Sequence, residues 1–242
     1  DATHSGAVAA AAGTKIVTIP QSTLLDETKV FALCYAETDG TAADNTWRDS
    51  YIRVRISKIQ AVSSHLVTHI TTGHIATVGS LPLSAAESSR GQIARLSTLE
   101  LTYIGSLNNN MWVSLVDATL NGNYPCTSAA VAAATADASH TGALQAGSTN
   151  KVLTFSNDQL DTSLSFAVCY TDDSAGDITS TWVDSSLRLS VSEVQTIVYG
   201  YPTRLMTAIN SPPSSQVFPR VTNVQTTYSG GLSNAMWLSF VD

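Results

Sequence analysis

FALCYAETDGTAADNTWRDSYIRVRIS, residues 31–57, is the stretch that decides the fold. Its two ends alternate apolar side chains with polar or small ones at a period of two, which is typical of half-buried β-strands. The apolar rows are Phe31, Leu33 and Tyr35 at the start, and Ile52, Val54 and Ile56 at the end. An acidic run containing Gly40 separates them. The stretch therefore predicts two strands joined by a polar loop.

The same stretch returns at residues 166–192 as FAVCYTDDSAGDITSTWVDSSLRLSVS. Outside it, DATHSGA at 1–7 returns as DASHTGA at 137–143, and MWVSLVD at 111–117 returns as MWLSFVD at 236–242. So many matches in the same order indicate a duplication. Copy one spans 1–117 and copy two spans 137–242. The Ala-rich connector 118–136 is expected to hold a short helix or to lie across a surface.

Each copy is long enough for one small domain, and its segments alternate in the strand manner throughout. Short strands and polar turns over this length are typical of a two-layer antiparallel sandwich. We therefore predict an all-β fold of two tandem homologous β-sandwich domains. Either an immunoglobulin-like or a jelly-roll strand order satisfies the pattern.

The composition excludes several classes of partner. Charged residues make up 13% of the chain and the formal net charge is −7, so cations are too few for a nucleic-acid surface. No run of about 20 apolar residues is present, so we expect no insertion into a membrane. Ser, Thr and Ala take the place of charged residues, which favours a secreted or cell-surface module.

The three cysteines are Cys34, Cys126 and Cys169. Cys34 and Cys169 occupy equivalent positions, and strand parity places both on the face opposite the Phe-x-Leu/Val-x-Tyr row. A disulfide from Cys126 to either would hold the connector across the outside of a sheet, and three small buried thiols in a cytosolic protein are the alternative. The pair is Cys126–Cys169 if the connector belongs to the following copy and Cys34–Cys126 if it belongs to the preceding one. Either choice leaves the odd cysteine near an end of the chain, which favours a segment of a longer extracellular array.

The loops between the Cys-Tyr and Thr-Trp pairs are candidates for binding calcium, whose preferred ligands are oxygens. Their spacing differs between the copies and does not match an EF-hand, so solvated strand connections are the favoured interpretation. No other cofactor is expected. The carboxylates concerned are Asp39, Asp44, Asp172, Asp173 and Asp177.

Trp112 and Trp237 lie on the strand face opposite the apolar row of the last strand in each copy. An outward Trp suits cover for the connector, contact with a neighbouring module or stacking on a sugar ring, in that order of preference. Asp49 and Arg53 are four residues apart, about 13 Å on a straight strand. Unless the backbone turns near Ser50, each is expected to find its partner on another strand or loop.

His4 and His140 match inside the DAxHxGA motif and are expected to serve a local hydrogen-bonding element. The chain contains no nucleophile elbow, P-loop, HExxH or dinucleotide glycine motif, so we expect no enzymatic activity.

The FALCYAE…TWRDSYIRVRISKI run and its partner FAVCYTD…TWVDSSLRLSVSEV resemble tandem β-sandwich modules of large secreted repeat proteins of algae and other protists. The resemblance implies a role in an extracellular coat, filament or adhesion protein, with neighbouring copies of the module or other matrix proteins as partners. A lectin-like module with one weak glycan site per copy is the alternative hypothesis.

Overall fold

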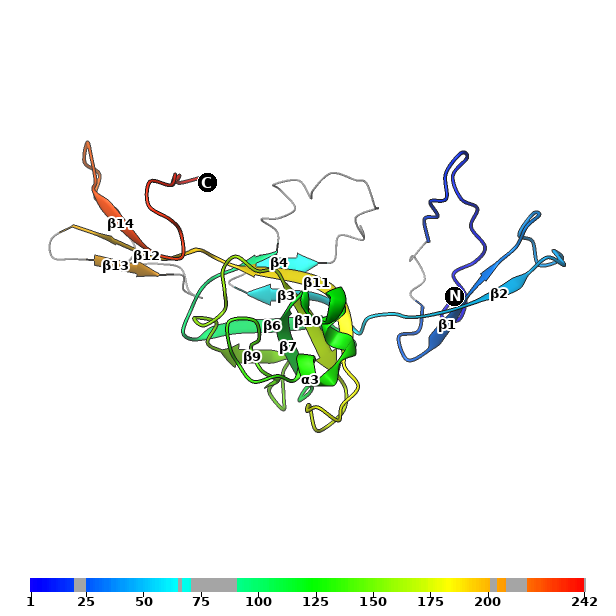
Figure 1. The fold of residues 1–242 in the computed structure, drawn as a ribbon. Helices are drawn as coiled ribbons and strands as arrows, with labels where there is room; N and C mark the ends of the chain where they lie inside the picture. Colours follow the sequence, from blue (N-terminus) through cyan, green and yellow to red (C-terminus); the bar gives the residue numbers. More distant parts are fainter. Residues whose placement is uncertain (20–24, 65–66, 71–90, 201–203, 208–216, 242) are drawn as a thin grey trace. The chain divides into compact units, whose positions relative to one another are not determined.

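The computed structural model describes residues 1–19, 25–64, 67–70, 91–200, 204–207 and 217–241. These residues form a nearly all-β structure, as predicted, with strands in four sheets (Figure 1). The chain divides into two units, residues 1–58 and 59–242. No helix within the described residues is long and apolar enough to cross a membrane.

The first unit contains one antiparallel pair, β1 (Val30–Tyr35) and β2 (Arg48–Arg55). Phe31 lies opposite Val54, and the register shifts between Ala32 and Cys34. These are the two strands predicted from the alternation at the ends of residues 31–57. Their side chains are largely exposed, because no second sheet lies against this pair among the described residues of the unit.

The second unit contains a sandwich whose sheets have the orders β4-β3-β6-β9 and β5-β11-β10-β7-β8. The strands up to β7 come from copy one, and β8 to β11 come from copy two. Their bounds are β3 (Ile59–Ser64), β4 (Val67–Ile70), β5 (Gln92–Ile93), β6 (Leu99–Gly105), β7 (Trp112–Asp117), β8 (Leu144–Gln145), β9 (Val152–Phe155), β10 (Phe166–Thr171) and β11 (Val183–Val191).

The two copies are interleaved in both sheets of this sandwich. In one sheet, β9 of copy two pairs with β6 of copy one, and Leu101 lies opposite Leu153. In the other, β10 of copy two pairs with β7 of copy one along its whole length, from Phe166 opposite Asp117 to Thr171 opposite Trp112. We predicted one sandwich for each copy, 1–117 and 137–242. The described sandwich instead forms across the boundary between the copies, from the second half of one and the first half of the next.

The core between the two sheets is apolar and draws on both copies equally. Tyr103, Leu101 and Leu115 of copy one are at most 1% exposed, as are Phe166 and Leu189 of copy two. The alternation of residues explains which side chains enter this core, since Phe166, Val168 and Tyr170 point inward from β10. It carries no information on which copy supplies the opposing strand, because the two copies have the same pattern.

The last three strands repeat the arrangement of β3, β4 and β6. They are β12 (Val194–Tyr199), β13 (Arg204–Thr207) and β14 (Thr226–Gly230), in the order β13-β12-β14. Ile197 lies opposite Tyr228, as Val62 lies opposite Tyr103. The hydroxyl of Tyr228 donates to the carbonyl of Ser233, and that of Tyr103 donates to the carbonyl of Asn108, so the turn after each strand is held in the same way.

The duplication supplies a matched pair of substitutions. Phe166→Ala removes a side chain that is fully buried in the sandwich. We expect it to lower the free energy of unfolding by about 3–5 kcal/mol, the usual loss for a buried Phe. Phe31→Ala, at the equivalent and partly exposed position, is expected to change it by well under half as much. Urea unfolding followed by circular dichroism measures both, and equal losses would contradict the burial described here.

Candidate functional site

The outer face of the β7–β10 pair carries a second, smaller apolar cluster beneath the connector. The connector contains α2 (Leu120–Asn123), the 3-10 turn η1 (Pro125–Thr127) and α3 (Ala129–Ala132). A short helix was one of the two structures expected for it. The turn η1 contacts β7, β10 and β11. The buried members of the cluster are Val116, Cys126, Ala132, Ala167, Cys169 and Trp182.

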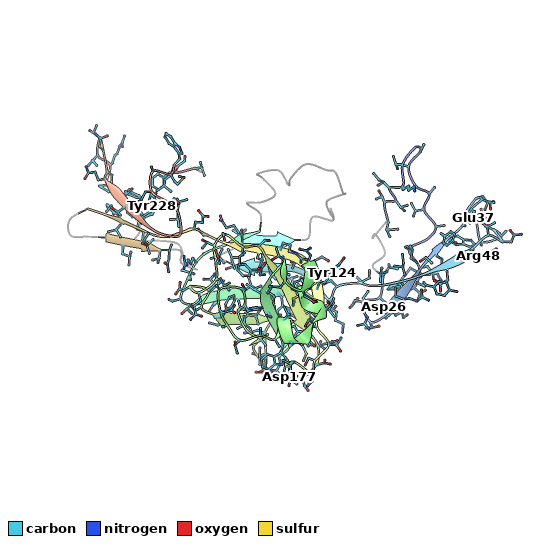
Figure 2. The ribbon with its side chains drawn as sticks, viewed as in Figure 1. Asp26, Glu37, Arg48, Tyr124, Asp177 and Tyr228 are labelled. Atoms are coloured by element: carbon cyan, nitrogen blue, oxygen red, sulfur yellow. A yellow bond between two sulfur atoms is a disulfide. The ribbon has the colours of Figure 1, made fainter. Side chains whose placement is uncertain are left out.

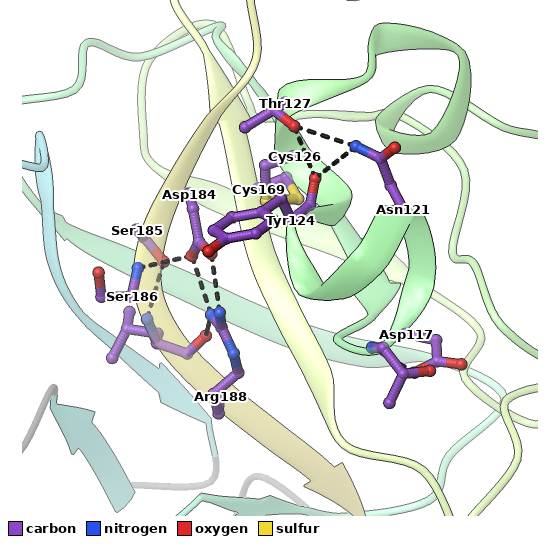
Figure 3. A network of polar contacts seen from close by, with 12 residues as sticks. Asp117, Asn121, Tyr124, Cys126, Thr127, Cys169, Asp184, Ser185, Ser186 and Arg188 are labelled. Carbon is purple, nitrogen blue, oxygen red and sulfur yellow. Dashed lines mark hydrogen bonds and ion pairs between the residues drawn. A yellow bond between two sulfur atoms is a disulfide. The ribbon is translucent and has the colours of Figure 1, made fainter. Parts of the chain in front are cut away.

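A disulfide joins Cys126 of the connector to Cys169 of β10, with the two Cα atoms 5.3 Å apart (Figure 3). Both residues are at most 1% exposed. This confirms the pairing expected if the connector belongs to the following copy, and it confirms that the bond holds the connector against the outside of a sheet. Cys34 is free and exposed. Each strand turns its cysteine away from the Phe-x-Leu/Val-x-Tyr row, as strand parity predicts.

Trp112 lies on this same connector side of β7 and packs against the small cluster. Its Nε1 donates to the carbonyl of Ser174, at 3.1 Å. A Cβ atom built on Gly176 would lie 2.1 Å from the Trp112 ring, so only a glycine leaves room for the ring, and its φ of +60° also favours glycine. Trp237, the equivalent residue of copy two, is 96% exposed.

An ion pair brackets a bulge in each copy, and Figure 3 shows the pair of copy two, Asp184 and Arg188. Arg188 Nη2 lies 2.7 Å from Asp184 Oδ2, and Arg53 Nη2 lies 2.7 Å from Asp49 Oδ2. Our expectation that Asp49 and Arg53 find separate partners was wrong. The backbone turns after Ser50, because Tyr51 takes a φ of +63°, and this folds residues that would be far apart on a straight strand onto one another.

The bulge is the same in both copies. Ala32 pairs with Arg53 and Cys34 with Asp49, so residues 50–52 stand opposite Leu33 alone. Residues 185–187 stand opposite Val168 in the same way. The hydrogen bond from Arg53, followed by that from the Tyr51 amide, holds the pKa of Asp49 below its ordinary value. The pair is half-exposed, so its contribution to stability is small.

The acidic loops use their carboxylates to hold their own backbone. Asp44 Oδ1 accepts from the hydroxyl and amide of Thr46, and its Oδ2 accepts from the amides of Asp39 and Gly40. The hydrogen bond from the Thr46 hydroxyl is the largest cause of a pKa of Asp44 far below the ordinary range. In Figure 2 the labels Glu37 and Arg48 mark the two ends of this loop in copy one.

The equivalent loop of copy two is built in the same manner. Asp177 accepts from the amide and hydroxyl of Thr179, and Asp173 accepts from the amide of Thr181. Asp172 is an exposed neighbour in this loop. Among the residues that the structure describes, no group of three or more His, Cys, Asp or Glu side chains is arranged to hold a metal ion.

The DAxHxGA motif forms a local polar element in both copies. His140 Nδ1 lies 2.8 Å from Asp137 Oδ1, and His4 Nδ1 lies 3.3 Å from Asp1 Oδ1. The hydrogen bond from His140 is the largest cause of a lowered pKa of Asp137. Each motif therefore closes a tight turn, as expected.

Sequence reasoning did not detect the feature that most distinguishes the copies, which is that the same residues are covered in one and uncovered in the other. Tyr35 is 47% exposed and its equivalent Tyr170 is 3% exposed. Phe240 is 74% exposed and its equivalent Leu115 is fully buried. The sequence contains no signal for this difference, because the residues themselves match. The uncovered surface of β1–β2 and the uncovered surface of residues 236–241 are, each by itself, candidate functional surfaces.

No protein-family model matches this chain, and neither a curated protein nor a solved structure does.

Proposed function

We propose that this chain is a non-enzymatic structural module of an extracellular repeat assembly, such as a filament, wall, surface coat or adhesion protein. Its duplicated sandwich sequence supplies length and repeated contacts rather than a reaction centre. Neighbouring copies of the module are the partners that this role requires.

The observation that carries this proposal is the pairing of strands across the boundary between the copies. Six consecutive residue pairs join β7 of copy one to β10 of copy two, from Trp112 opposite Thr171 to Asp117 opposite Phe166. A linkage of this kind resists separation of neighbouring modules through a full ladder of main-chain hydrogen bonds, not through a surface contact. The Cys126–Cys169 bond adds a covalent closure over the same strand.

The chemistry of the chain supports an extracellular setting for this role. Disulfides persist in oxidising compartments, and the Cys126–Cys169 bond is buried within the cluster beneath the connector. The low charged fraction of 13% leaves a surface rich in hydroxyl groups. Both features suit a protein that stays folded outside the cell.

Electron microscopy of the native assembly, isolated without reducing agent, tests the role. We expect a periodic structure with an axial repeat on the order of 40 Å, the length of a nine-residue strand and a two-residue joint at about 3.3 Å per residue. A native protein that is a freely soluble monomer would contradict the proposal. A glycan array run on the same protein gives the control. Binding that disappears in Trp237→Ala would assign a lectin role instead.

A further inference from the structure

The described sandwich has its counterparts at the two ends of the same chain, divided into two halves. Residues 1–55 hold the equivalents of β9, β10 and β11, namely 16–19, β1 and β2. Residues 194–241 hold the equivalents of β3, β4 and β6, namely β12, β13 and β14, and, at 237–241, the described part of the equivalent of β7. Together the two halves contain the main strands of one further sandwich.

One ladder in each half already has the register that it has in the complete sandwich. The β1–β2 pair repeats the register and bulge of β10–β11, with Cys34 opposite Asp49 as Cys169 is opposite Asp184. The β12–β14 pair repeats β3–β6, with the left-handed Gly230 at the position of Gly105. These two ladders are therefore preformed, whereas residues 16–19 and 236–241 belong to no strand.

The side chains that would close such a sandwich are apolar and uncovered. On the N-terminal half, Ile52 and Val54 are 53% and 46% exposed, whereas their equivalents Leu187 and Leu189 are at most 2% exposed. Residues 236–241, which would add to β1 in the same sheet, are equally uncovered. Those that correspond to Met111 and to the core residues of β7 are Met236, Leu238 and Phe240, each at least 45% exposed.

The β7–β10 ladder specifies how the halves would pair. Transferring its register places Cys34 opposite Ser239, because Cys169 lies opposite Ser114. Leu33 then lies opposite Phe240, and Tyr35 opposite Leu238. The β6–β9 ladder likewise places Val17 opposite Thr226, since Leu101 lies opposite Leu153.

The short joints favour a second copy as the partner. The chain enters the described sandwich at β3 and leaves it from β11, and these two strands belong to different sheets. Only residues 56–58 and 192–193 link the two halves to it, and they span about 10 Å or less when extended. Joints this short leave one half little freedom to reach the other around the sandwich, so a second copy is the partner that supplies each complement.

We propose that the N-terminal half of one copy, through β1 and β2, closes a sandwich with the C-terminal half of a second copy, β1 pairing with residues 236–241 in the register of β10 on β7. Repetition of this contact builds a head-to-tail chain of alike sandwiches. The inference rests on the proposed structural role and supplies its mode of assembly. A head-to-tail contact of this kind is heterologous, and it builds open filaments when its rotation does not close a ring.

Capping variants of the full 242-residue chain test the contact. Leu33→Asp places a carboxylate in the N-terminal half of the interface, and Phe240→Asp places one in the C-terminal half. We expect the wild type to grow beyond the 25.5 kDa chain mass as its concentration rises, and each variant alone to stay at that mass, by size exclusion with light scattering. An equimolar mixture of the two variants retains one intact interface and is expected to stop at twice the chain mass.

The matched control is Ile178→Asp, an apolar residue that is 67% exposed on a loop of the described sandwich and lies outside the proposed contact. It is expected to assemble like the wild type. A wild type that stays at one chain mass at every concentration overturns the inference, as does a mixture of the two variants that forms no dimer.

Cross-linking tests the register without relying on a disruptive variant. Ser239→Cys places a thiol opposite the native Cys34, within the Cα separation that a disulfide tolerates. Oxidised glutathione takes two electrons and two protons from this thiol pair, giving the new disulfide and two reduced glutathiones. We expect a ladder of multimers on non-reducing gels. Val241→Cys places the thiol diagonal to Cys34 and is expected to give at least tenfold less cross-linked multimer.

A cross-link found only within single chains, or a stronger one from Val241→Cys, overturns the inference. The proposed function fails separately, because it is judged on the native assembly by microscopy. If the native protein forms a periodic filament but the Ser239→Cys variant does not cross-link, the structural role is kept and the proposed contact is rejected.

Discussion

A fragment of residues 59–193 is expected to fold and to unfold in one cooperative transition, whereas a fragment of residues 1–117 is not. The first fragment contains β3 to β11, the core between their sheets and the Cys126–Cys169 bond. The second is the repeat as the sequence defines it, but it lacks β9, β10 and β11. It therefore leaves Leu101 and Leu115 without the strands that bury them.

Near-ultraviolet circular dichroism and urea titration of the two purified fragments measure this difference. For residues 59–193 we expect a sharp aromatic spectrum and a single transition with a free energy of unfolding of several kcal/mol, the usual range for a small domain. For residues 1–117, kept dilute enough to stay monomeric, we expect a broad, non-cooperative titration. The fragment 118–242, which has the other repeat with its connector, is the control and is expected to behave like 1–117. A cooperative transition in 1–117 would show that one copy closes a sandwich by itself.

Removing the disulfide with Cys126→Ala and Cys169→Ala together is expected to lower the free energy of unfolding by about 4 kcal/mol. The bond closes a loop with a sequence separation of 43, and the loop-closure entropy of an unfolded loop of that length gives this figure at 25 °C. For a domain of this size the loss corresponds to a fall in Tm on the order of 10–15 °C. The connector would also lose its covalent attachment to β10. Cys126 and Ala132 are buried side chains of the connector, 1% and 0% exposed.

Differential scanning calorimetry with and without a reducing agent measures the effect. Reduction should lower the Tm of the wild type to near that of the double variant and leave the double variant unchanged. Cys34→Ala provides the matched control, because Cys34 is the equivalent residue but is free and exposed. A shift of similar size in Cys34→Ala, or none in the double variant, would contradict the role assigned to the bond.

Local features of the fold were predictable because they depend on the parity of side chains along a strand. The alternation in FAVCY placed Phe166, Val168 and Tyr170 on one face and Cys169 on the other, and the structure places the first three in the main core and Cys169 under the connector. The loop carboxylates bond their own backbone, in keeping with the favoured interpretation as strand connections. Parity is a property of each strand alone, so no tertiary information was needed.

The Asp184–Arg188 pair was not predictable from spacing, because spacing assumes a straight strand. Three residues of β11 stand opposite one of β10, and Ser186 takes a φ of +66°. Neither Ser186 nor its equivalent in copy one, Tyr51, is a residue type that predicts a left-handed backbone. The presence of Trp-x-Asp-Ser-x-x-Arg in both copies was the available signal that these residues act together.

The sequence by itself determined that this protein is all-β and built from two alike copies, and it limited the disulfide to two candidate pairs. Only the tertiary structure decided that Cys126 bonds Cys169 and that the described sandwich forms between the copies and not within one. The physical reason is that strand pairing is satisfied equally by any strand of matching register and apolar face. Because the two copies have the same pattern, the pattern does not show which copy supplies the strand that pairs with β7. The connector, held by its disulfide, places β10 of copy two beside β7.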